Sequence, residues 1–74
     1  MKHLKGKKAG KRVIKNFKAS VKDGLEIPVG ESYDAIEAWA TDYISDKNFG
    51  TTDVAYAKEY ARFEISNHIK SIFV

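Results

Sequence analysis

The run SYDAIEAWATDYIS, residues 32–45, carries the clearest structural signal in the chain. Its apolar residues recur as adjacent pairs every four positions, which places them on one stripe of an α-helix. Ser32 is a suitable N-cap, and Asp34 and Glu37 put negative charge near the positive end of the helix dipole. We therefore expect a helix over 32–45 whose buried stripe consists of Ala35, Ile36, Trp39, Ala40, Tyr43 and Ile44.

Length and composition restrict the class of protein around this helix. Seventy-four residues make one small domain with a small core. The chain has no cysteine, which excludes disulfides and thiolate metal sites. It has no run of about 18 apolar residues, and its lysine-rich start lacks the apolar segment of a secretory signal. We expect a soluble, cytoplasmic protein without a membrane partner.

Charge is distributed unevenly along the chain. Residues 1–24 hold nine Lys or Arg and one acid (+8), and residues 25–74 hold four and nine (−5), which together give the net +3. Residues 1–11 show neither helical nor alternating periodicity and contain two glycines. We therefore predict a disordered basic arm over 1–11, followed by a single folded domain over 12–74.

The next segment, residues 12–29, alternates between apolar and polar residues and predicts a β-hairpin. A turn at Asp23-Gly24 separates its two strands. A three-residue loop keeps both apolar faces on the same side, whereas a two-residue turn would oppose them. The predicted cross-strand pairs are Val21 with Leu25, Ala19 with Ile27, and Phe17 with Val29.

A second helix is predicted from about Asp53, and its end is open to two interpretations. An aliphatic stripe of five turns favours a helix that continues to Phe73, with members Val54, Ala57, Ala61, Ile65, His68, Ile69 and Ile72. Residues 69–74 are also rich in β-branched and aromatic residues, which favours a third strand. The predicted fold is α+β, an N-terminal hairpin packed against two amphipathic helices, with this third strand as an alternative.

Tyr56, Tyr60 and Phe63 cluster on the second helix opposite its aliphatic stripe. They either complete the core or form an exposed aromatic patch, the kind of surface that binds a protein partner or a second copy of the chain. Our first hypothesis is a small accessory or inhibitor-like interaction module that binds a protein through this patch, with the basic N-terminal arm assisting by electrostatic steering.

The alternative hypothesis is nucleic-acid binding through the basic segment. Lysine without interleaved aromatic residues favours contact with the phosphate backbone, or with an acidic partner, over base recognition. The candidate residues are Lys2, Lys5, Lys7, Lys8, Lys11, Arg12, Lys15, Lys18 and Lys22.

Little in the sequence indicates catalysis. His3 lies in the predicted arm, and His68 has no serine or second histidine at a motif spacing. Glu64 and His68 lie four residues apart, but two ligands without a third do not make a metal site. We therefore expect a protein that is not an enzyme and has no cofactor, metal or small-molecule substrate.

Overall fold

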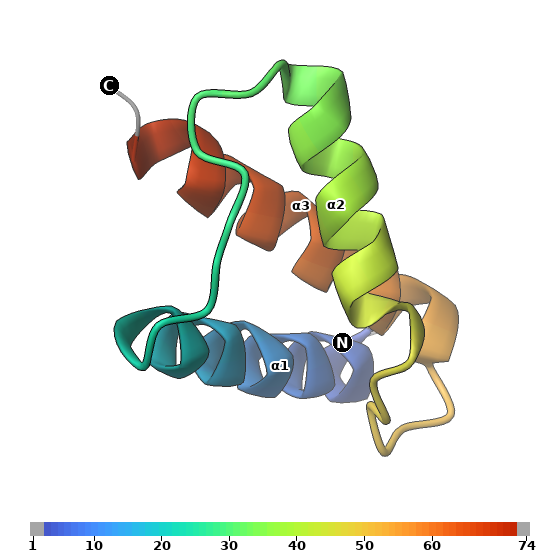
Figure 1. The fold of residues 1–74 in the computed structure, drawn as a ribbon. Coiled ribbons are helices and arrows are strands. Elements are labelled where there is room, and N and C mark those ends of the chain that lie inside the picture. The colour runs from blue at the N-terminus through green and yellow to red at the C-terminus, as the bar shows by residue number, and fades with distance from the viewer. Residues whose placement is uncertain (1–2, 73–74) are drawn as a thin grey trace.

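The computed structural model describes residues 3–72, and over this range the chain forms three α-helices and no strand (Figure 1). Helix α1 spans Leu4–Lys22, α2 spans Tyr33–Ser45 and α3 spans Val54–Ile72. Helix α3 packs against both α1 and α2. The protein is therefore all-helical, and the predicted α+β class with its N-terminal hairpin is wrong.

Helix α1 replaces both the predicted disordered arm and the first strand of the hairpin. Val13, Phe17 and Val21 are four residues apart, a spacing that fits a strand and a helix equally well. The strand interpretation treated Ile14 and Lys15 as interruptions, whereas the helix buries Ile14 and exposes Lys15. Residues 4–11 form the first half of α1, and Lys2 lies outside the described residues.

The Asp23-Gly24 pair ends α1 instead of turning a hairpin. Gly24 has φ +108°, a conformation that favours glycine. Its N–H donates to the carbonyl of Val21 at 3.1 Å, and the N–H of Leu25 donates to that of Ser20 at 2.9 Å. This pair of bonds is the Schellman motif of a helix C-terminus. Residues 23–32 then cross from the end of α1 to the start of α2 (Figure 1).

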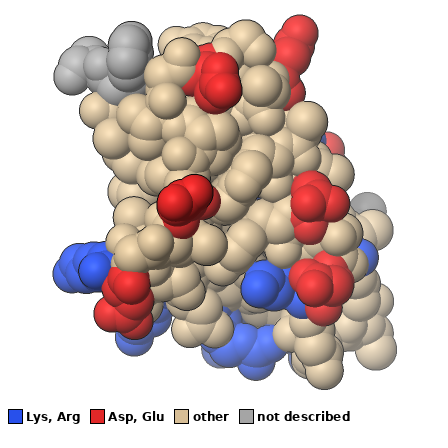
Figure 2. Space-filling view, in the orientation of Figure 1, with Lys and Arg blue, Asp and Glu red and all other residues tan. Residues whose placement is uncertain are grey.

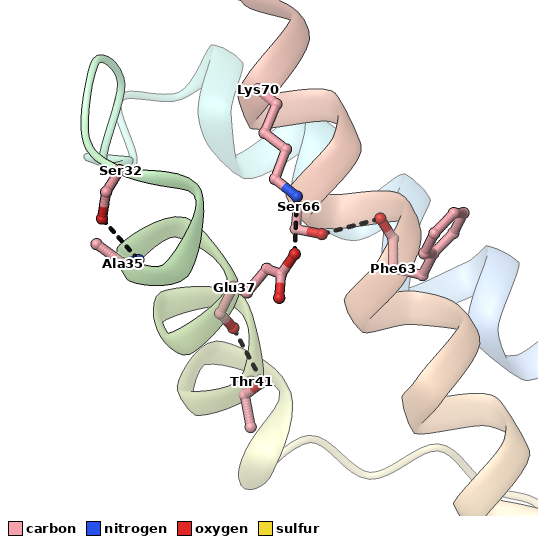
Figure 3. A network of polar contacts seen from close by, with 7 residues as sticks. All are labelled: Ser32, Ala35, Glu37, Thr41, Phe63, Ser66 and Lys70. Carbon is pink, nitrogen blue, oxygen red and sulfur yellow. Dashed lines mark hydrogen bonds and ion pairs between the residues drawn. The ribbon is translucent and has the colours of Figure 1, made fainter.

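The helix predicted over 32–45 is confirmed. Ser32 is the N-cap of α2, and its hydroxyl accepts the Ala35 N–H at 3.2 Å (Figure 3). Ile36, Ala40 and Ile44 are buried, and the half-buried rings of Trp39 and Tyr43 lie against the core. The predicted stripe therefore faces inward, although its first member, Ala35, is exposed.

The second predicted helix is confirmed in its longer form, because α3 continues to Ile72. The alternative third strand does not form over 69–72, and residues 73–74 lie outside the described range. Four members of the aliphatic stripe are fully buried, namely Ala57, Ala61, Ile65 and Ile69. Val54 and Ile72, at the two ends, are exposed.

The core is centred on Phe17 of α1, which has no exposed surface. Its ring makes edge contacts with Trp39 and Tyr43 of α2, at centroid distances of 6.1 and 5.5 Å, and with His68 of α3 at 5.9 Å. One aromatic side chain thus connects all three helices.

A polar contact also joins α2 to α3 (Figure 3). The Lys70 ammonium donates to Glu37 Oε2 at 2.8 Å and lies 4.7 Å from the centre of the Tyr33 ring. The hydrogen bond and charge of Lys70 lower the pKa of the Glu37 carboxyl.

Candidate functional site

Eight of the nine predicted basic residues, all except Lys2, which lies outside the described range, lie together on one side of α1. At about 100° per residue, they cover an arc of roughly 160° opposite the apolar face of the helix. All of them are exposed, and α1 contains no acidic residue. We call this set the basic face: Lys5, Lys7, Lys8, Lys11, Arg12, Lys15, Lys18 and Lys22.

In the described part of the chain, no cation of the basic face lies within ion-pair distance of a carboxylate. Within residues 3–72 the two close pairs are His3 with Asp53 and Lys70 with Glu37, and neither involves the basic face. In Figure 2, Lys and Arg gather along the lower edge of the molecule, where α1 runs, and most Asp and Glu lie above them. The uneven charge of the sequence therefore becomes a spatial separation.

The predicted aromatic patch is divided in the structure. Tyr56 and Tyr60 are half-buried, stack on each other at 6.3 Å, and cover the two glycines of α1. A Cβ atom at Gly10 would lie 2.6 Å from Cδ2 of Tyr60. The two tyrosines thus contribute to the contact between α1 and α3, whereas Phe63 is 55% exposed.

Tyr60 also lies beside the basic face. A shallow cavity of about 320 Å³ between α1 and α3 is lined by Tyr60, Lys11, Lys15 and Lys18, together with Ile14 and Glu64. The structure thus brings one member of the predicted aromatic set next to three members of the predicted basic set.

The two histidines have packing roles. His3 stacks on Tyr56 at a centroid distance of 4.1 Å, and its Nδ1 lies 2.9 Å from Oδ2 of Asp53. This contact could not be predicted from the sequence, because residues 1–11 were expected to form a disordered arm. His68 lies edge-on to Phe17. Over residues 3–72, no three His, Cys, Asp or Glu side chains are grouped to hold a metal ion.

Among the described helices, none combines the length and apolar character needed to cross a bilayer. The chain matches no family model, and comparisons with curated proteins and with solved structures found no match.

Proposed function

We propose that the protein binds the phosphate backbone of nucleic acid through the basic face of α1, without reading base sequence. The observation that carries the proposal is the set of eight exposed cations on one helix, none of them paired with a carboxylate in residues 3–72. A row of cations of this kind releases counterions when it meets a polyphosphate. The role is one of binding, not catalysis, and is compatible with the expected cytoplasmic location.

The composition of the basic face favours nucleic acid over an acidic protein. Seven of its eight cations are lysine, a residue depleted in protein interfaces and suited to point contacts with phosphate. A protein interface also needs a buried apolar centre, and the apolar side of α1 is already packed inside the molecule. The protein-partner hypothesis is less well supported, because Tyr56 and Tyr60 are engaged with α1 and only Phe63 of that set is well exposed.

The test is a salt titration of binding to a random DNA duplex, followed by fluorescence anisotropy. If six of the cations meet phosphates, the logarithm of the binding constant falls against the logarithm of salt concentration with a slope of about −5. The triple variant Lys11→Gln, Lys15→Gln, Lys18→Gln should reduce the size of this slope by about 2.7, since each phosphate contact contributes about 0.9.

A matched control removes three positive charges from outside α1, through Lys47→Gln, Lys58→Gln and Arg62→Gln. This control should keep the slope of the unmodified chain, although it has the same net charge as the α1 variant. Circular dichroism should show that both variants are folded. Equal slopes for the two variants, or binding that does not respond to salt, would refute the proposal.

A further inference from the structure

A second cavity, of about 530 Å³, opens between the first half of α1 and the loop that joins α2 to α3. Its floor is apolar, formed by the buried residues Ala9 and Phe49. Its walls carry positive charge on the α1 side and small polar residues on the loop side. The wall residues are Lys5, Lys8, Arg12, Gly50, Thr51 and Thr52.

Arg12 is fixed in place by the loop. Its Nη2 donates to the carbonyl of Phe49 at 2.7 Å and to that of Asn48 at 3.4 Å. Gly50 has φ +65°, and a Cβ there would lie 3.3 Å from Nη2 of Arg12. Glycine is therefore favoured at this position both by the backbone conformation and by the guanidinium beside it. The Asn48 side chain holds the turn by accepting the Gly50 N–H at 3.0 Å.

The walls keep unused hydrogen-bond donors. A guanidinium has five N–H groups, and in the described residues only Nη2 of Arg12 has a partner. The Thr51 hydroxyl oxygen accepts the Asp53 N–H at 3.2 Å, which leaves its own hydrogen free to donate. Neither Lys5 nor Lys8 lies within ion-pair distance of a described carboxylate.

Among residues 3–72, no acidic residue lines this cavity. The carboxylate of Asp53, which follows the loop, lies against Gly6 and within 2.9 Å of His3 Nδ1. Three cations and two hydroxyl groups thus face one hollow without a negative charge among them. This arrangement matches a compact oxyanion with a charge near −2, which a phosphate monoester carries and a backbone diester does not.

We propose that this cavity binds a phosphate monoester, with Arg12 as the fixed ligand and Lys5, Lys8 and Thr51 as additional donors. The phosphate comes either from the end of a nucleic-acid strand or from a free small molecule. Binding of a strand end rests on the proposed function, because the remainder of the basic face would hold the nucleic-acid backbone next to that end. Binding of a free small molecule does not rest on it.

The first experiment titrates the full chain with inorganic phosphate at constant ionic strength and follows backbone amide signals by NMR. The amides of Gly50, Thr51 and Thr52 should shift and saturate. The variant Lys5→Gln, Lys8→Gln should weaken the affinity for phosphate by about tenfold or more, because it removes two charge-assisted contacts.

The matched control, Lys18→Gln, Lys22→Gln, removes the same charge from the same helix outside the cavity. At about 1.5 Å per residue these two lysines lie roughly 15 and 21 Å along α1 from Lys8, so salt largely screens their charges at the cavity and the affinity for phosphate should change by less than about twofold. Shifts that do not saturate, or equal weakening in the two variants, would overturn the proposal.

The second experiment distinguishes the sources. Two DNA duplexes of one sequence, with 5′-phosphate or 5′-hydroxyl ends, are compared by anisotropy. A preference for the phosphorylated end that is lost in Lys5→Gln, Lys8→Gln supports the pocket and assigns it to nucleic-acid ends. Saturable binding of inorganic phosphate with no end preference supports the pocket and assigns it to a small phosphate. Salt-dependent duplex binding without phosphate saturation overturns the pocket alone and leaves the proposed function standing.

Discussion

The contact between Gly10 and Tyr60 sets how closely α1 approaches α3, and replacing Gly10 with alanine tests it. The change has two opposing effects. Alanine favours a helix over glycine by about 1 kcal/mol in a helix interior. The new Cβ would lie 2.6 Å from Cδ2 of Tyr60 and 3.3 Å from the Ala57 carbonyl oxygen, and overpacking of this kind costs about 1–3 kcal/mol. We therefore expect Gly10→Ala to destabilise the folded state by about 1 kcal/mol.

The same substitution in a Tyr60→Ala background separates the two effects. Without the tyrosine ring the steric term largely disappears, and Gly10→Ala should then stabilise the protein by up to about 1 kcal/mol. The two backgrounds should thus differ by about 1–3 kcal/mol, which is the coupling between the two positions. Ala19→Gly, at an exposed position of α1, is the control. It should destabilise both backgrounds equally, by about 1 kcal/mol.

Urea denaturation, monitored by the fluorescence of Trp39, is a suitable assay. The ring centroid of this single tryptophan lies 6.1 Å from that of Phe17, so its fluorescence reports loss of the core. A change of 1 kcal/mol corresponds to roughly 4–8 °C in Tm for a domain of this size. If Gly10→Ala stabilised both backgrounds equally, the close contact of α1 with α3 through this glycine would be refuted.

Three further predictions follow from contacts in the core and at its edge. Phe17→Ala should lower the free energy of unfolding by about 3–5 kcal/mol, measured by chemical denaturation, because it empties the centre of the core. Arg12→Ala should lower it by about 1–3 kcal/mol in the same assay, since the carbonyl of Phe49 loses a partly buried donor. Lys70 holds the pKa of Glu37 below its ordinary value of 4.5, so this carboxylate stabilises the fold above that pH and the effect is lost as pH falls below it. The Tm difference between the unmodified chain and Glu37→Gln should accordingly be largest near neutral pH and disappear in acid.

Helix α2 could be predicted because independent local signals agree there. The N-cap at Ser32, the acidic first turn at Asp34 and the 3.6-residue apolar period all mark the same start and the same inward side. None of these signals depends on contacts with distant residues. The end of α3 could not be predicted because the local propensities of residues 69–74 fit both a helix and a strand. In the structure α3 continues to Ile72, and Ile69 is fully buried.

Helix α1 could not be predicted from local signals, and Gly6 and Gly10 are the main reason. Glycine disfavours a helix by about 1 kcal/mol relative to alanine. Two glycines among many lysines therefore predict a disordered segment. Their benefit is non-local, since each leaves room for an aromatic side chain of α3, Tyr56 or Tyr60. A single sequence shows the unfavourable propensity of these glycines but not the packing that compensates for it.

The candidate site could be predicted from the sequence only in part, again because it depends on packing between residues that are far apart in the chain. The cations of the basic face could be identified from sequence, but as a strip along a disordered arm and a strand edge and not as one side of a packed helix. The cavity beside Arg12 was missed, because the loop over 48–52 carries no motif that pairs it with α1. The sequence feature that points to this loop is Asn48 two residues before Gly50. This pair forms an asparagine-capped turn with a glycine in the left-handed region.

Placing the cations on a packed helix also changes the thermodynamics of the proposed binding. A disordered arm loses about 1–2 kcal/mol of backbone entropy for each residue that becomes fixed on a ligand. In α1 this ordering is already supplied by Phe17 and by the contacts of Gly6 and Gly10 with α3. In the proposed complex the lysines would therefore meet phosphate with their spacing along the helix set in advance, and less of the interaction energy would be spent on ordering the chain. If the proposal holds, the buried side of α1 contributes to the affinity of its exposed side, although none of the buried residues would contact the ligand.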